Sequence, residues 1–154
     1  MTHDSLQDIV VTITGAGQGI GRGLAQAFGR AGARVVIGDI DGAAAQSAAT
    51  DLRAAGAQAV ALRVDVRRAE DNAALVEAAI ESFGRLDVMI ANAGVMQLKP
   101  LLDLDAADWD GLLSVNVTGV FLSLQAAARR MLAQEPLAPG RPRGKIINLA
   151  SVAS

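Results

Sequence analysis

The stretch Thr14-Gly15-Ala16-Gly17-Gln18-Gly19-Ile20-Gly21 decides how this chain begins to fold. It follows a β-branched apolar run over residues 9–13 and leads directly into a helix-length segment over residues 21–31. Alternate glycines suit a tight turn in which several positions tolerate no Cβ. The sequence therefore predicts a strand, a glycine-rich turn and a helix in immediate succession.

This turn is a candidate anion site. The free N–H groups and the positive dipole end of the following helix would hold a phosphate group without any basic side chain. A glycine-rich turn between a strand and a helix is the context expected for the pyrophosphate of a dinucleotide, and a turn without a ligand is the alternative. The residues predicted to bind the cofactor here are Gly15, Gly17, Gln18, Gly19, Ile20 and Gly21.

The rest of the chain alternates strand-length apolar runs with helix-length segments. Strands are expected over residues 9–13, 34–37, 59–64, 86–90 and 145–149, and helices over residues 21–31, 42–55, 69–83 and 106–133. Apolar strands joined by helix-length crossovers predict a parallel sheet. The fold class is therefore α/β, a doubly wound Rossmann-type sheet with helices on both faces, in a single domain over residues 1–154.

Composition excludes several classes of function. The 154 residues are 51% apolar and 19% charged, which suits one domain with a large core. Without cysteine the chain forms no disulfide or thiolate metal site, and His3 as the single histidine excludes a Ser-His-Asp triad. No metal site is predicted. A net charge of −2 and 3% aromatic residues argue against a nucleic-acid partner.

The cellular location of the protein is predicted from two segments of the sequence. Residues 1–8 are polar and lack the basic region of a secretory signal. Residues 111–128 are uncharged but contain several polar side chains, and their apolar residues recur at helical spacing. We therefore expect a buried helix of a soluble, cytoplasmic protein rather than a membrane span.

Asp39 ends the second expected strand, 18 residues after Gly21. A carboxylate at this position accepts hydrogen bonds from a ribose 2′-OH and repels a 2′-phosphate. Its neighbours Gly38 and Ile40 carry no positive charge. Asp39 and Ile40 are therefore predicted to bind the cofactor and to favour NAD over NADP, and a solvated aspartate at a strand end is the alternative.

Five motifs in this order resemble those of the short-chain dehydrogenase/reductase family. They are Thr14-Gly-x-x-x-Gly19-x-Gly21, Asp65-Val66, Asn92-Ala93-Gly94, Asn116 within residues 114–119, and Ile146-Ile147-Asn148-Leu149-Ala150-Ser151. Taken singly, each motif has a purely structural alternative such as a strand cap or a turn. Their common order and spacing carry the resemblance.

The resemblance implies a role for each motif. Asp65 and Val66 would contact the adenine ring, and Asn92, Ala93 and Gly94 would line the cofactor site. The catalytic residues would be Ser151, hydrogen-bonded to the substrate oxygen, and Asn116, holding a proton-relay water. The family also implies a small-molecule alcohol or ketone substrate and a homo-oligomer, a tetramer or dimer.

The sequence departs from the family in one respect. It contains no tyrosine, and the family's Tyr-x-x-x-Lys segment would lie about a dozen residues past Ser151. We therefore expect a sheet truncated after its fifth strand and a longer enzyme from which this part comes. Three functions stay open: an NAD-dependent oxidoreductase of secondary alcohols or carbonyls (polyol, sugar, steroid or 3-oxoacyl), a catalytically inactive NAD-binding fragment, and an interaction fragment pairing through its open edge.

Overall fold

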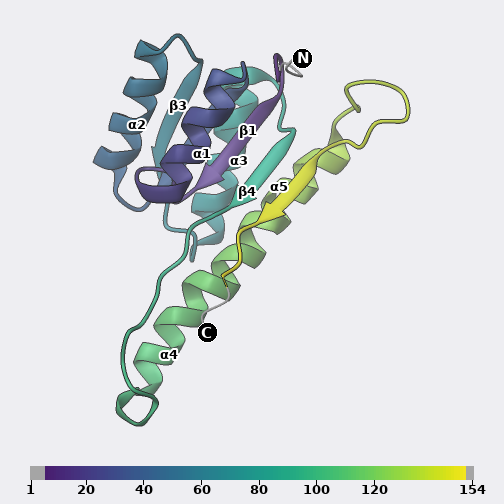
Figure 1. Ribbon diagram of the computed structural model, residues 1–154. Helices are drawn as coiled ribbons and strands as arrows, with labels where there is room; N and C mark the ends of the chain where they lie inside the picture. The colour runs from purple at the N-terminus through teal and green to yellow at the C-terminus, as the bar shows by residue number, and fades with distance from the viewer. Residues whose placement is uncertain (1–5, 152–154) are drawn as a thin grey trace.

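Five parallel strands form the centre of the structure in the order β3-β2-β1-β4-β5 (Figure 1). The computed structural model describes residues 6–151. The strands are β1 (Val10–Thr14), β2 (Arg34–Asp39), β3 (Ala59–Arg63), β4 (Val88–Ala91) and β5 (Lys145–Asn148). Every neighbouring pair is parallel, and the order reverses direction between β1 and β4. The predicted doubly wound α/β fold is confirmed.

Helices connect the strands as the sequence predicted. They are α1 (Gly19–Arg30), α2 (Gly42–Ala54), α3 (Ala69–Phe83), a short 3-10 turn η1 (Leu101–Asp103), α4 (Ala106–Leu113), a π-helical segment η2 (Ser114–Gly119) and α5 (Val120–Ala133). The last three follow one another without a break and form the long helix expected over residues 106–133. The first helix begins at Gly19, two residues before its predicted start.

Alternate residues of the central strands pack into two separate hydrophobic cores, one on each face of the sheet. Val11 and Ile13 pack with the alanine-rich faces of α1 and α2, whereas Val10 packs on the other side with α3 and α5. Strand side chains alternate between the faces of a sheet, so this division requires helices on both sides. All residues of β1 and β4 are buried, as expected for the inner strands of a covered parallel sheet.

The long helix differs from its prediction. We expected a buried helix, but α4 has no buried residue, and α5 buries only Ser123, Ala127 and Met131. Residues Ala106–Ala133 have a mean hydropathy of 1.4 in an 18-residue window and could cross a membrane by length and composition, with 17% of that window buried. Figure 1 shows the α4 end extending well beyond the sheet. The prediction of a buried helix was wrong because large apolar side chains such as Trp109, Phe121 and Leu132 lie outside the stripe that packs into the core.

The strand β5 lies at the edge of the sheet, as predicted. All four of its residues are exposed, and Ile146 and Ile147 retain 40% and 41% of their accessible surface. Hydrogen bonds from β4 fix one side of β5, and no strand in the described part of the chain pairs with the other. Its outer edge is therefore unpaired within residues 6–151, and its two isoleucines stay partly exposed.

One polar group interrupts the core between α3 and α5. The Asn72 side chain is fully buried and donates to the carbonyl oxygens of Val66 at 2.7 Å and Arg68 at 2.8 Å. Its Oδ1 accepts from the Ser123 hydroxyl at 2.7 Å. The network joins the loop after β3 to the long helix, and each of these side-chain groups is satisfied.

Removal of this network should destabilise the fold. We expect Asn72→Ala to lower the free energy of unfolding by about 2–3 kcal/mol and Ser123→Ala by about 1–2 kcal/mol, because each leaves a buried partner unsatisfied. The double variant should cost less than the sum, since the two residues share one hydrogen bond. Urea denaturation measures all three, with Thr50→Ala on the exposed face of α2 as the control at about 0.5 kcal/mol or less. Strict additivity, or an Asn72→Ala loss no larger than the control, would contradict the role of the network.

Candidate cofactor-binding site

A cavity of ≈ 500 Å³ opens at the carboxyl ends of β1, β2, β3 and β4. Parallel α/β sheets bind ligands at this edge, where the strand order reverses. Its lining residues are Gly15, Gln18, Ile20, Gly21, Asp39, Ile40, Val64, Asp65, Val66, Arg67, Asn92, Ala93, Gly94, Val95 and Val115.

Hydrogen bonds between Thr14 and Asn92 fasten the glycine turn to the end of β4. The Asn92 amide donates to the carbonyl oxygens of Thr14 and Gly15, each at 2.9 Å. In return the Thr14 hydroxyl accepts from the backbone N–H groups of Asn92 and Ala93, each at 3.1 Å. These hydrogen bonds fix the positions of Gly15, Asn92 and Ala93, which line the cavity.

Two glycines are required where these segments meet. A Cβ on Gly21 would lie 2.3 Å from the Gly15 carbonyl oxygen and 2.5 Å from the Asn92 amide nitrogen. A Cβ on Gly15, which has a φ of +63°, would lie 2.8 Å from the Ala93 Cα. Side chains at either position would push the first turn of α1 away from β4.

Asp39 ties the end of β2 to the same turn. Its carboxylate accepts from the Gly17 N–H at 2.8 Å and from the Asp41 N–H at 3.0 Å, and the residue is 8% exposed. A Cβ on Gly17 would lie 3.0 Å from the Asp39 Cγ. The sequence placed Gly17 among the residues that touch a cofactor, whereas here it supports Asp39 from outside the cavity lining.

The first turn of α1 presents uncapped N–H groups beside the cavity. Gln18 precedes the helix, and its side chain caps none of them. Gln18, Ile20 and Gly21 all line the cavity, and Arg22 pairs with Asp51. Uncapped N–H groups at a helix start attract anions.

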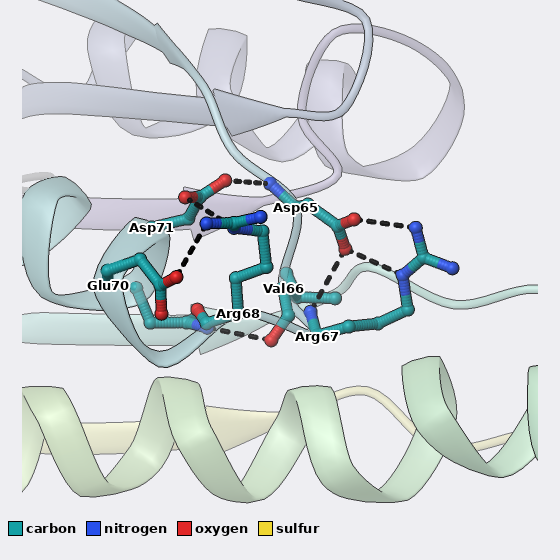
Figure 2. Close-up of polar contacts among 7 residues, drawn as sticks. Asp65, Val66, Arg67, Arg68, Glu70 and Asp71 are labelled. Atoms are coloured by element: carbon teal, nitrogen blue, oxygen red, sulfur yellow. Dashed lines mark hydrogen bonds and ion pairs between the residues drawn. The ribbon is translucent and has the colours of Figure 1, made fainter.

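Asp65 lies beyond the end of β3 and is held by Arg67 (Figure 2). Its Oδ1 accepts from the Arg67 N–H at 3.1 Å and Nε at 2.8 Å, and its Oδ2 accepts from Nη2 at 2.6 Å. These hydrogen bonds from Arg67 lower the pKa of the Asp65 carboxyl, against the opposing effect of burial. The carboxylate is therefore kept ionised at the wall of the cavity.

Asn116 braces the loop that follows β4. It lies in the π-helical segment η2, and its side chain donates to the Val95 carbonyl oxygen at 2.8 Å and accepts from the Val95 N–H at 2.9 Å. Both amide atoms therefore hold backbone. Its predicted part in holding a water stays a prediction.

Ser151 follows β5 by three residues and is exposed. Because Ala91 pairs with Asn148 in parallel strands, the residues after β5, including Ser151, start from the same edge of the sheet as the residues after β4. Ser151 does not line the cavity. His3, the single histidine, lies outside the described residues.

The cavity contains most of the residues predicted from the sequence. Every predicted cofactor residue lines it except Gly17 and Gly19, and neither Asn116 nor Ser151 does. The residues not predicted are Val64, Arg67, Val95 and Val115. All four adjoin a predicted motif residue. Val64, Arg67 and Val95 also follow strand carboxyl ends, whereas Val115 precedes Asn116 on the long helix.

The chain is similar to known proteins over almost its whole length. The profile of the short chain dehydrogenase family matches residues 9–154. The chain is 39% identical over 148 residues to 2-(S)-hydroxypropyl-CoM dehydrogenase 3 of Xanthobacter autotrophicus, covering 96% of this chain and 55% of that protein. It is 36% identical over 141 residues to a diacetyl reductase [(S)-acetoin forming] of Staphylococcus epidermidis, covering 92% of this chain and 52% of that protein.

A solved structure has the same fold. The crystal structure of a short-chain type dehydrogenase/reductase from Mycobacterium marinum superposes with a TM-score of 0.89 at 32% sequence identity, over 98% of this chain and 60% of that one. The chain thus spans a little over half the length of these curated relatives. Given a family match over residues 9–154 and a shared fold at this identity, the chain belongs to the short chain dehydrogenase family of oxidoreductases.

Proposed function

We propose that this chain binds NAD(H) as the cofactor-binding part of an oxidoreductase that interconverts a secondary alcohol and a carbonyl compound. Asp39 is the observation that supports NAD most directly. It is a carboxylate fixed by two backbone N–H groups at the wall of the cavity, beside a neutral Ile40. A ribose 2′-OH would donate to it, and a 2′-phosphate would meet like charge.

The other parts of the cavity suit the remaining groups of a dinucleotide. The glycine-rich turn leaves no room for a Cβ at Gly15 or Gly21. The N–H groups of the first turn of α1 would hold the pyrophosphate. Asp65 and Val66 lie beyond the end of the neighbouring strand β3, where the family resemblance assigns the adenine ring.

The nicotinamide ring supplies the hydride acceptor or donor of such a reaction. On this proposal the Ser151 hydroxyl donates a hydrogen bond to the substrate oxygen, and Asn116 orients the loop after β4 and a proton-relay water. None of the 154 residues is a tyrosine, so these residues do not supply the family's acid–base group.

The substrate class is proposed from the relatives. Their names include a 2-(S)-hydroxypropyl-CoM dehydrogenase, a diacetyl reductase and, from Synechocystis at 34% identity over 94% of this chain, a 3-oxoacyl-[acyl-carrier-protein] reductase. Each acts on a secondary alcohol or a ketone.

The proposed homo-oligomer is supported by Val117 and Phe121, two apolar side chains that are exposed on the long helix. The proposed location of the protein is the cytoplasm.

The missing tyrosine gives the alternative, a chain that binds NAD without catalysis. For the 154-residue chain we expect NADH to bind, seen as a change in its fluorescence, and ADP-ribose to compete. No NAD-linked oxidation of secondary alcohols should follow, because no residue of the chain can replace the tyrosine. Absence of NADH binding would contradict the proposal, and turnover by this chain would contradict the assignment of the acid–base step.

Asp39 should control the choice between NADH and NADPH. The double variant Asp39→Ala, Ile40→Arg removes a negative charge and adds a positive one, and we expect the preference for NADH over NADPH to fall by about tenfold or more. Dissociation constants for both cofactors measure the ratio. The control is Asp41→Asn, which removes a nearby charge but keeps the cap of α2. An unchanged ratio in the double variant would refute this role of Asp39.

Gly19 should be needed for binding although its surroundings are open. A Cβ there meets nothing within 4 Å, but its φ is +54° and it begins α1. Gly19→Val would strain the turn and put a branched side chain at the proposed pyrophosphate site, so NADH affinity should fall by about tenfold or more. Gly23→Val, one turn later and equally open, should bind as wild type does. Equal affinities for both variants would show that the turn is only structural.

A further inference from the structure

Arg67 and Asp65 form the only ion pair of the described residues in which both partners line the cavity. The sequence motifs gave Arg67 no role. Its side chain is 47% exposed, whereas that of Asp65 is 12% exposed. The arginine therefore covers the carboxylate from the solvent side.

The loop that carries this pair is fixed at several points. The Arg68 N–H donates to the Asp65 carbonyl oxygen at 3.0 Å, and the Asp65 N–H donates to the Asp71 carboxylate at 2.9 Å. Buried Asn72 holds the carbonyl oxygens of Val66 and Arg68. The position of the Asp65 carboxylate then depends on its own side-chain contacts, and these all come from Arg67.

The contacts leave a defined set of acceptor sites. A carboxylate has about four lone-pair sites, two on each oxygen. Arg67 uses two on Oδ1 and one on Oδ2, so one site on Oδ2 remains. The adjoining Val66 N–H has no hydrogen-bond acceptor among residues 6–151. The wall of the cavity thus offers one acceptor next to one donor.

We infer that Arg67 is a positioning residue for base recognition, which fixes the Asp65 carboxylate so that this wall accepts a 6-aminopurine and rejects a 6-oxopurine. Adenine presents an N–H donor beside a ring-nitrogen acceptor, which complements Oδ2 of Asp65 and the Val66 N–H. Hypoxanthine presents an oxygen acceptor beside an N–H donor, so each of its groups meets a like group. The inference rests on the proposed dinucleotide function and adds the source of its base specificity.

Arg67 has two effects on the carboxylate. Its forked contact fixes the orientation of the oxygens, as guanidinium–carboxylate pairs do. It also holds the pKa of Asp65 below its ordinary value, so the carboxylate stays an acceptor into more acidic solution. Without Arg67 the side chain would rotate, and protonation would begin at a higher pH.

The test compares NADH with reduced nicotinamide hypoxanthine dinucleotide, which differs only in the purine. Wild type should bind NADH about tenfold or more tightly than the hypoxanthine analogue. Arg67→Ala should weaken NADH binding by about tenfold, and affinity for the analogue should change by about twofold or less. Arg67→Lys keeps the charge without the fork and should give an intermediate ratio.

Arg68→Ala is the matched control. Arg68 carries the same charge one residue along and pairs with Glu70 and Asp71 (Figure 2). It does not line the cavity. Its removal should leave the ratio of the two affinities unchanged. In Arg67→Ala, the loss of NADH affinity on acidification should begin at a higher pH than in wild type. If Arg67 had only a structural role, its removal would change neither the affinity ratio nor this pH profile.

Each result separates the inference from the proposed function. If wild type binds neither dinucleotide, the proposed function fails and the inference with it. If wild type binds both equally, or Arg67→Ala keeps the wild-type ratio and acid profile, the inference alone is overturned. An equal change in Arg67→Ala and Arg68→Ala would also overturn it. Thermal melting of each variant checks that a changed ratio comes from folded protein.

Discussion

The hydrogen bonds between Thr14 and Asn92 are the constraint on which the rest of the site depends. They join the turn after β1 to the loop after β4, at the point where the strand order reverses. The contact is close enough that Gly15 and Gly21 have no space for a side chain. Because α1 starts from this turn, the same bonds aim its uncapped N–H groups at the cavity. The position of an anion is thereby set by backbone geometry, without a basic side chain.

A second set of contacts connects the far wall of the cavity to the long helix. Val66 packs against Gly119, where a Cβ would lie 2.7 Å from the Val66 Cγ2, and Asn72 bonds to Ser123 one turn further along. The loop after β3 therefore rests on the helix whose π-helical segment carries Asn116. That helix in turn holds the loop after β4 through Val95. The two walls of the cavity are thus supported by one element, and both are positioned by buried or backbone hydrogen bonds.

The sequence predicted the strand and helix order, and most of the cavity lining, because both follow from local signals. Apolar runs and helix-length spacers define a parallel sheet, and residues at strand carboxyl ends meet at one edge. The place of Arg67 beside the Asp65-Val66 motif could have been predicted, but its side-chain contact with Asp65 could not, because no spacing rule describes that contact. The exposure of α4 and α5 was missed because composition reports how apolar a helix is, whereas burial depends on what packs beside it. A glycine motif also does not distinguish a glycine that touches a ligand from one that supports Asp39, as Gly17 does here, and the contact of Gly17 with a cofactor stays a prediction.

The central claim is that the sheet edge at the turn of α1 and the loop after β3 bind one dinucleotide. The most direct measurement is a titration of the ¹⁵N-labelled chain with NADH, followed through its backbone amide resonances. We expect the largest shifts at the N–H groups of Ile20, Gly21 and Val66. Little change is expected along a second groove, between α3 and α5, whose lining includes Val76, Leu122 and Ala126. Shifts confined to that groove, or no shifts at the first turn of α1, would contradict the account.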